Sequence, residues 1–172
     1  MAARQKIVKL AQKIASSKKE FTQQDPEYYA LECVVTDEHA DVALNMDVRV
    51  PISPAKLSQK CGKSLEETTR ILEELLVIGV VEATREHGDL EYTLPIFVPG
   101  VMEFMVMNVQ QVEKYPQIAR AFEQLSLQPL KGATPMIPVG GGGLGMHVIP
   151  VEEAIPAETQ TASYEQLSHW LK

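Results

Sequence analysis

The chain has 172 residues, of which 45% are hydrophobic, enough to bury a core in one domain or in one domain with an appendage. No run approaches the roughly 18 apolar residues that a membrane span needs, and Arg4, Lys6 and Lys9 interrupt the N-terminus where a signal peptide would be apolar, so we expect a cytoplasmic protein. The separate cysteines Cys33 and Cys61 suggest neither a disulfide framework nor a zinc ribbon, and we expect both to be small buried or half-buried side chains.

Charge is distributed unevenly along the chain. Six basic residues precede the first acidic one, Glu20, and residues 20–172 hold 10 basic against 23 acidic side chains, a formal charge of −13. Such a body is repelled by a phosphate backbone, whose neutralisation by Lys and Arg supplies most non-specific affinity for nucleic acid. Only the first segment could serve that purpose.

Residues 1–24 are predicted to form a basic amphipathic helix, running from Ala3 to about Lys18. We expect its apolar stripe to pack on the body and its lysines to be solvated. A partner-docking helix and a membrane-surface helix are the alternatives, and the lack of Trp or Phe on the stripe weakens the second. The stripe consists of Ile7, Leu10, Ala11 and Ile14.

Residues 25–50 predict two short helices. Asp25 suits a helix cap and Pro26 suits the first turn. Asp37 suits the start of the second helix, and His39 on its polar side is expected to be solvated rather than a ligand. The inward face of this helix is predicted to comprise Ala40, Ala43 and Leu44.

Residues from about Pro51 to Pro95 carry the strongest pattern. Ser53 with Pro54 marks a helix start, and Gly62 suits the turn to a second helix. That helix begins at the capping box Ser64-Leu65-Glu66-Glu67 and ends at Gly79. Its inward face is predicted to comprise Leu65, Thr69, Leu72, Leu75 and Leu76.

Two alternating segments follow this helix. Val80–Thr84 and Leu90–Leu94 flank the turn-rich stretch Glu86-His87-Gly88-Asp89, which predicts a β-hairpin. Helix, turn, helix and hairpin in this order predict a winged helix-turn-helix, which with its preceding helices occupies residues 25–95. The expected fold class is α+β, mostly α, with flanking helices and an extended Pro/Gly-rich C-terminal segment.

The charge of this domain disfavours DNA as its partner. A winged helix usually lays its second helix in the major groove. Here the single Arg70 on that helix cannot offset four carboxylates facing phosphate, and Arg85 of the wing is likewise surrounded by acidic residues. We therefore expect the domain to dock protein. The opposing carboxylates are Glu66, Glu67, Glu73 and Glu74 on the helix, and Glu82, Glu86, Asp89 and Glu91 on the wing.

Residues 96–127 are predicted to form a Met-rich helical pair. The first helix, from Val101 to Tyr115, is apolar around much of its circumference and so needs cover on two sides. We assign Met102 and Met105 to partner docking, although methionines at this spacing also fill cores. The pair is expected to clamp onto the winged domain or to form a self-association surface, as in a homodimer. The second helix, from Pro116 to about Leu125, is predicted to turn Ile118, Ala119, Phe122 and Leu125 inward.

Residues 128–162 are predicted to form a Pro/Gly-rich loop, and residues 163–172 the start of a helix that continues in a longer parent protein. The letters at Gly140, Gly142 and Gly145 fit G-x-G-x-x-G, but the strand, helix and acidic residue of a dinucleotide site are missing, so a flexible loop is favoured. His147 is expected to be structural rather than catalytic. In this part of the chain, the residues that we assign to partner docking are Gly141, Gly142, Gly143, His147 and Trp170.

Five stretches carry a resemblance to a known family: PGVMEFMVMN, VEKYPQIARAFEQ, PVGGG, HVIPVEEAI and TASYEQLSHWLK. From about Val34 to its end, the chain resembles the N-terminal region of ferredoxin-like proteins and large oxidoreductases of anaerobic bacteria. In that family a winged-helix segment precedes cysteine-rich segments that hold [4Fe-4S] clusters, often beside a flavin- and NAD(P)-binding pyridine-nucleotide oxidoreductase part. Cys33 and Cys61 do not match the cluster ligands, so no metal residue is carried over.

The resemblance implies a non-catalytic docking domain of an iron-sulfur electron-transfer protein. The cofactors, [4Fe-4S] clusters with flavin or NAD(P), would belong to the parent or its partner and not to this chain. A DNA-binding transcription regulator, assisted by the basic N-terminal helix, is the second hypothesis. An enzyme in its own right ranks last, because no cluster of acid, base and nucleophile is evident in the sequence.

Overall fold

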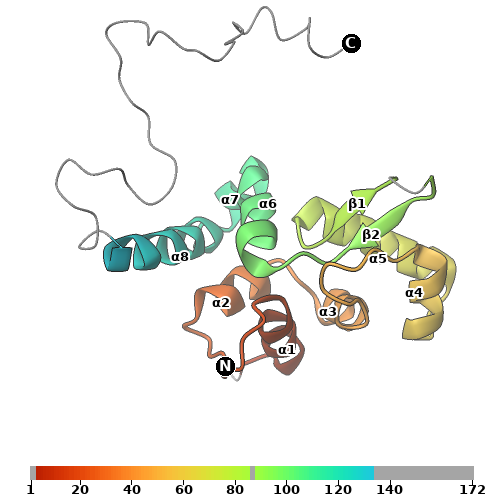
Figure 1. The fold of residues 1–172 in the computed structure, drawn as a ribbon, viewed down its shortest axis with the longest axis horizontal. Helices are drawn as coiled ribbons and strands as arrows, with labels where there is room; N and C mark the ends of the chain where they lie inside the picture. Colours follow the sequence, from red (N-terminus) through yellow and green to blue (C-terminus); the bar gives the residue numbers. More distant parts are fainter. Residues whose placement is uncertain (1–2, 86–87, 134–172) are drawn as a thin grey trace, which may run out of the picture. The chain divides into compact units, whose positions relative to one another are not determined.

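The computed structural model describes residues 3–85 and 88–133, and Figure 1 shows their arrangement. The described part is mostly helical, with a small two-stranded antiparallel sheet. Its elements in chain order are α1 (Gln5–Ile14), α2 (Pro26–Glu32), α3 (Asp37–Leu44), α4 (Pro54–Cys61), α5 (Leu65–Ile78), β1 (Glu82–Thr84), β2 (Glu91–Thr93), the irregular turn η1 (Phe97–Val101), α6 (Met102–Met107), α7 (Val109–Lys114) and α8 (Gln117–Ala133).

Several predictions made from the sequence fall outside the described residues. They are the Pro/Gly-rich loop beyond Ala133, the helix at 163–172 and the docking residues Gly141, Gly142, Gly143, His147 and Trp170.

Helix α1 packs on the body, as the favoured interpretation of its stripe requires. Ile7, Leu10, Ala11 and Ile14 are all fully buried. Arg4 at the start of α1 and two lysines within it also contact α3. Arg4 pairs with Asp37 at 2.6 Å, Lys6 pairs with Asp41 at 2.6 Å, and the Lys13 ammonium donates to the Leu44 carbonyl at 2.8 Å. Lys6 is exposed, as predicted for the lysines of this helix, whereas the prediction is wrong for Lys13, which is half-buried against α3.

Local capping chemistry explains where α4 and α5 begin and end. The Ser53 hydroxyl accepts from the Lys56 amide, and Pro54 occupies the first turn of α4. Gly62 ends α4 and Gly79 ends α5, both in the left-handed conformation. These boundaries confirm the prediction.

The capping box of α5 is only half formed. The Ser64 hydroxyl accepts from the Glu67 amide at 3.1 Å, but the Glu67 carboxylate binds the Lys63 ammonium instead of returning to the backbone. Asp25 departs in the same way, because its carboxylate accepts from the amide and hydroxyl of Thr22 instead of capping α2.

The predicted inward face of α5 is rotated by about one residue from the observed one. Leu65 and Leu76 are exposed, at 53% and 39%, because the outer side of the helix faces solvent. The buried side faces α3 and α4, and tertiary packing, not the apolar count alone, selects it. Its buried residues are Thr68, Ile71, Leu72 and Leu75.

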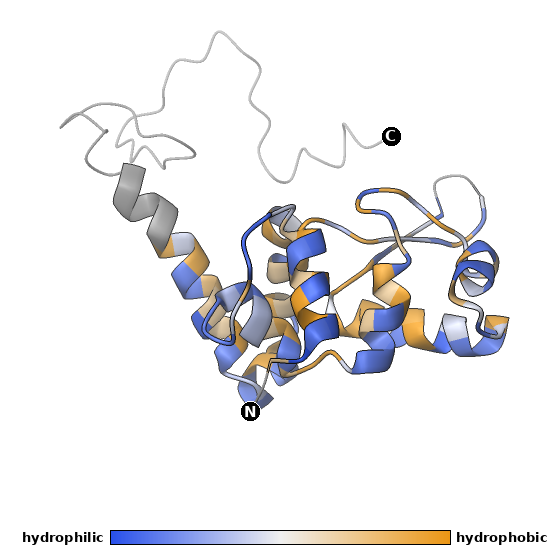
Figure 2. Ribbon diagram, turned by 90° about the horizontal axis from the view of Figure 1, so that it is seen from below, coloured by the Kyte–Doolittle hydropathy of each residue, from blue (hydrophilic) through white to orange (hydrophobic). Residues whose placement is uncertain are grey.

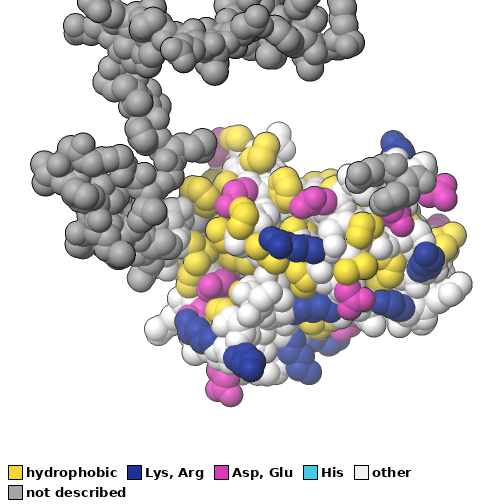
Figure 3. All heavy atoms as spheres, in the orientation of Figure 1, with side chains coloured by type: hydrophobic (Ala, Val, Ile, Leu, Met, Phe, Trp, Pro, Cys, Tyr) yellow, Lys and Arg dark blue, Asp and Glu magenta, His cyan; other side chains and the backbone are white. Residues whose placement is uncertain are grey.

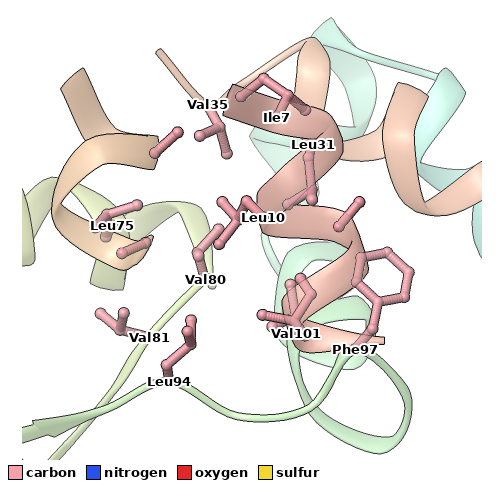
Figure 4. Close-up of a cluster of buried hydrophobic side chains, with 14 of the residues drawn as sticks. Ile7, Leu10, Leu31, Val35, Leu75, Val80, Val81, Leu94, Phe97 and Val101 are labelled. Carbon is pink, nitrogen blue, oxygen red and sulfur yellow. The ribbon is translucent and has the colours of Figure 1, made fainter. Parts of the chain in front are cut away.

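The core joins residues that lie far apart in the sequence. Figure 4 shows Leu10 of α1 near Leu31 of α2 and Val80, and Leu75 of α5 belongs to the same buried cluster. Figure 2 shows that the helices carry hydrophobic residues on one side and hydrophilic residues on the other. The N-terminal helices therefore share one core with α5, the hairpin and η1.

The predicted hairpin is present, but only β2 alternates in burial, because Glu82 and Ala83 of β1 are both exposed. β1 pairs antiparallel with β2, in the register Glu82 to Thr93, Ala83 to Tyr92 and Thr84 to Glu91. Ile52 forms a bridge to Tyr92 on the opposite edge of β2. The free edge of this sheet in the described residues is thus the outer side of β1.

The predicted continuous helix from Val101 to Tyr115 is wrong. Asn108 has non-helical dihedral angles and divides the segment into α6 and α7. Its side-chain oxygen caps α7 by accepting from the Gln111 amide at 3.1 Å, while its side-chain nitrogen donates to the Val77 carbonyl at 3.1 Å. This long-range contact with α5 competes with helix continuity.

The last described helix is longer than expected. α8 runs to Ala133, so the predicted loop does not begin at residue 128. Ile118 and Ala121 are buried, but Ala119 and Phe122, both predicted to point inward, are exposed. The helix contacts the body with a narrower face than its composition suggests.

Candidate docking surface

A hollow surface lies between the C-terminal half of α5, strand β1 and helix α6. We call it the α5–β1–α6 groove. Its volume is about 400 Å³. Val77 is 70% exposed and Met107 is 75% exposed, and Figure 3 shows hydrophobic side chains gathered over α6 and α7 on the visible face. The groove is lined by Leu76, Val77, Gly79, Val81, Glu82, Ala83, Phe104 and Met107.

Helix α6 supplies one wall and is apolar on two sides. Met102 and Met105 point into the core and are fully buried, whereas Phe104 and Met107 are exposed on the groove side. The assignment of Met102 and Met105 to partner docking is therefore corrected, because their inward face gives no surface for a partner. The sequence predicted that this helix needs cover on two sides, and the described residues cover α6 on one side.

Gly79 sets the separation of the groove walls. It has a φ of +89°, and a Cβ added there would lie 2.8 Å from the Met105 nitrogen and 2.8 Å from the Phe104 carbonyl carbon. The α6 backbone thus lies directly against the end of α5. Gln111 reinforces the contact, since its side-chain nitrogen donates to the Ile78 carbonyl at 3.1 Å. For the first predicted helix, now α6 and α7, these contacts agree with the alternative in which the helical pair clamps onto the winged domain.

The groove has acidic neighbours without ion-pair partners among the described residues. Glu82 lines it, and Glu73 lines an adjoining hollow that shares Val77 with it. Both glutamates are exposed. A partner that covers Val77 therefore meets Glu82 on one side and Glu73 on the other, the latter in a hollow that is also lined by Arg70, which is paired with Glu38 and Glu74.

An ion-pair network adjoins the groove on α5, since Arg70 and Glu74 line the same hollow as Glu73 and Val77. Arg70 lies 3.1 Å from the Glu38 carboxylate and 2.7 Å from the Glu74 carboxylate, and Lys63 lies 3.6 Å from Glu38. The hydrogen bond from Arg70 lowers the pKa of Glu38, and hydrogen bonds from His39 and then Arg70 lower the pKa of Glu74. The one arginine of α5 is therefore already engaged with two carboxylates of the same molecule.

His39 is buried, so its predicted solvated state is wrong. Its Nδ1 accepts from the Thr36 amide at 3.2 Å, and its Nε2 lies 2.8 Å from the Glu74 carboxylate. The Thr36 hydroxyl accepts in turn from the His39 amide, which makes a reciprocal cap at the start of α3. His39 has a structural role in joining α3 to α5.

The described residues contain neither a metal-binding cluster nor a nucleophilic cysteine. In residues 3–85 and 88–133, no group of three or more His, Cys, Asp and Glu side chains could hold a metal ion. Burial raises the pKa of the Cys33 thiol to about 11 and also raises the pKa of the Cys61 thiol. Both thiols are thus protonated near neutral pH and poorly nucleophilic.

No helix in the described ranges has both the length and the apolar character needed to cross a membrane. Comparisons of the chain with family models, curated proteins and solved structures found no match.

The sequence interpretation missed the groove residues, although one signal for them was present. Phe104 and Met107 are three residues apart, as are Met102 and Met105, so the two pairs occupy different sides of one helix. The pattern shows that both sides are apolar but not which one the body covers. Leu76 and Val77 were not recognised as exposed groove residues because the predicted inward face of α5 was rotated from the observed one.

Proposed function

We propose that this chain is a protein-docking module that binds its partner through the α5–β1–α6 groove. The observation that carries the proposal is the uncovered apolar side of α6, where Phe104 and Met107 meet Val77 of α5 across a hollow. Contiguous exposed apolar side chains beside polar residues are typical of protein interaction sites. The fixed contact of α6 with Gly79 keeps the two walls in place before a partner arrives.

The fold that we propose for α3 to β2 is a winged helix-turn-helix. The order of α4, the turn at Gly62, α5 and the β1–β2 hairpin supports it, as does the bridge from Ile52 to the sheet. In this interpretation α5 is the recognition helix and the hairpin is the wing.

The charge of the proposed winged helix-turn-helix disfavours DNA binding. Arg70 is held by Glu38 and Glu74, so it is not free to meet a phosphate or a base. Arg4, Lys6 and Lys13 of the basic N-terminal segment bind the body in the same way. With duplex DNA, we expect no saturable change in fluorescence anisotropy at about 0.15 M salt. Binding that weakens steeply with salt would favour the transcription-regulator hypothesis.

The resemblance to anaerobic ferredoxin-like proteins suggests the kind of partner. We propose that the docked protein, or the docked part of a longer parent, carries [4Fe-4S] clusters or a flavin. The module would then hold a redox centre near its electron donor or acceptor without taking part in the chemistry.

A site-specific cross-link tests both parts of the proposal. A benzoylphenylalanine at Met107 should form one discrete adduct in cells of the source organism, and the substitution Val77→Asp in the same chain should reduce its yield about tenfold, because an unpaired carboxylate would be buried in the contact. Val50, which is 50% exposed and lies outside the groove, is the matched position for both the photoreactive residue and a control Val50→Asp.

The identity of the adduct decides what remains of the proposal. Mass spectrometry should identify a protein that binds iron-sulfur clusters or flavin when purified. A specific adduct with a protein of another class would refute the redox assignment and leave docking. Equal adducts from Met107 and Val50, or none from Met107, would refute docking at this groove.

A further inference from the structure

The outer edge of β1 offers backbone hydrogen-bonding groups to the groove. In an antiparallel pair, facing residues alternate between those that exchange hydrogen bonds and those that do not. The Tyr92 amide donates to the Ile52 carbonyl and the Tyr92 carbonyl accepts from the Ile52 amide, both at 2.9 Å. The backbone of Tyr92 is thus committed to the side of β2 away from β1.

This commitment fixes the direction of the Ala83 backbone. Ala83 faces Tyr92 in the register of the hairpin, so the two form the pair that exchanges no hydrogen bonds. The N–H and C=O of Ala83 therefore point away from β2, toward the open edge of the sheet. Ala83 is exposed and also lines the α5–β1–α6 groove, so the open edge and the apolar hollow adjoin.

An extended segment can use both features together. Its backbone would exchange two hydrogen bonds with Ala83, and its alternate side chains would point to the same face. A side chain on that face would enter the hollow against Phe104 and Met107. A helix placed there would bury the same hollow but could not satisfy the Ala83 amide and carbonyl, because its own backbone groups are already paired.

Charge selects among extended segments. Glu82 and Glu73 are exposed beside the hollow and have no ion-pair partner in the described residues, so a Lys or Arg of the incoming segment would find a carboxylate. A second copy of this chain would instead bring the same two carboxylates toward each other. The complementary occupant is basic.

From this geometry we infer that the groove binds its partner by strand addition, with an extended segment of another protein joining the free edge of β1. The segment carries an apolar side chain for the hollow and a Lys or Arg within two or three residues of it. This inference rests on the proposed docking function and adds the conformation and chemistry of the bound partner.

The substitution Ala83→Pro isolates the backbone contribution. Proline deletes the outward N–H, and the β1–β2 ladder does not use that N–H, so the hairpin is expected to remain. Ala83→Val, which keeps the N–H, is the matched comparison. The probe is a fluorescein-labelled synthetic peptide that spans the partner residues mapped by the Met107 cross-link, and its Kd is measured by anisotropy with the full chain.

We expect Ala83→Pro to raise Kd about fivefold over Ala83→Val, as expected for one backbone hydrogen bond. Glu82→Gln should weaken binding and reduce its salt dependence. Equal Kd values for the two Ala83 variants, beside a large loss in Val77→Asp, would overturn strand addition and leave docking intact. If neither Ala83→Pro nor Val77→Asp weakened peptide binding, docking at the groove would itself be refuted. A mapped peptide without Lys or Arg would overturn the inference that the segment is basic. A peptide from this same polypeptide would overturn the inference that it belongs to another protein.

Amide hydrogen exchange in the unsubstituted chain gives an independent result if Ala83→Pro fails to fold. Peptide binding should slow exchange of the Ala83 amide and leave the exchange of the α7 amides unchanged. Unchanged exchange at Ala83 in the peptide-saturated protein would overturn the inference.

Discussion

At the scale of single residues, Gly79 and His39 show how strongly this fold depends on contacts that a sequence pattern does not reveal. Gly79 was recognisable as a helix terminator, and it also admits the α6 backbone at a distance that no side chain would allow. His39 was expected to be solvated because it lies between Glu38 and Asp41 in the sequence. Its actual partners, Thr36 and Glu74, come from its own helix cap and from α5.

The two helix-terminating glycines make a matched pair for mutagenesis. Gly79→Ala should lower the free energy of unfolding by about 2 to 4 kcal/mol, since it combines an unfavourable left-handed residue with a clash against α6. Gly62→Ala should cost only about 1 kcal/mol, because Gly62 is also left-handed but nothing lies within 4 Å of its added Cβ. Urea denaturation measures both, and equal losses would contradict the close approach of α6.

At the scale of elements, the contact between α3 and α5 should make the stability of the fold depend on pH in the acidic range. The pKa of Glu74 is lower in the folded chain than its usual value of 4.5, chiefly through the hydrogen bond with His39. The stabilisation from this carboxylate is therefore complete above about pH 4.5 and is lost as the pH falls through the folded pKa. Glu74→Gln should flatten the decline of Tm with acid, whereas Glu123→Gln on the exposed side of α8 should leave it unchanged. Parallel declines in both variants would contradict the contribution of the pair.

Helix α1 should behave as part of the core and not as a detachable basic arm. Leu10→Ala removes a fully buried side chain that lies close to Val80 in Figure 4, and we expect it to cost about 2 to 5 kcal/mol of unfolding free energy. Lys9→Ala, on the exposed side of the same helix, should change stability by less than about 0.5 kcal/mol. A small effect of Leu10→Ala in chemical denaturation would show that α1 is dispensable.

The sequence predicted the elements with local end signals better than it predicted their faces. Ser53, Pro54, Ser64 and the two terminating glycines act through neighbours in the chain, so the bounds of α4 and α5 could be inferred from them. The buried face of α5 depends on α3 and α4, and the break at Asn108 depends on the Val77 carbonyl. The groove was missed for the same reason, because its walls meet only in the folded chain.

At the scale of the whole molecule, the proposal that this chain docks a redox protein without holding its cofactors can be tested by measuring iron content. We expect this 172-residue chain to bind no iron after anaerobic purification, whereas the gene product that contains it, if longer, should show iron and the broad visible absorption of iron-sulfur clusters. Absorption spectra and iron analysis of both chains, prepared side by side, make the comparison. Iron bound stoichiometrically by this chain alone would contradict the assignment of the clusters to the parent or partner.

The short length of β1 bears on colloidal behaviour as well as on binding. An exposed strand edge is a template on which identical chains can stack without limit, and longer, uncharged edges are the usual origin of such growth. Here the edge is three residues long and begins at Glu82, so a second copy gains few backbone hydrogen bonds and meets a carboxylate that has no ion-pair partner in residues 3–85 and 88–133. An edge that accepts one basic strand, as we propose for β1, is therefore also expected to resist fibril growth in concentrated solution.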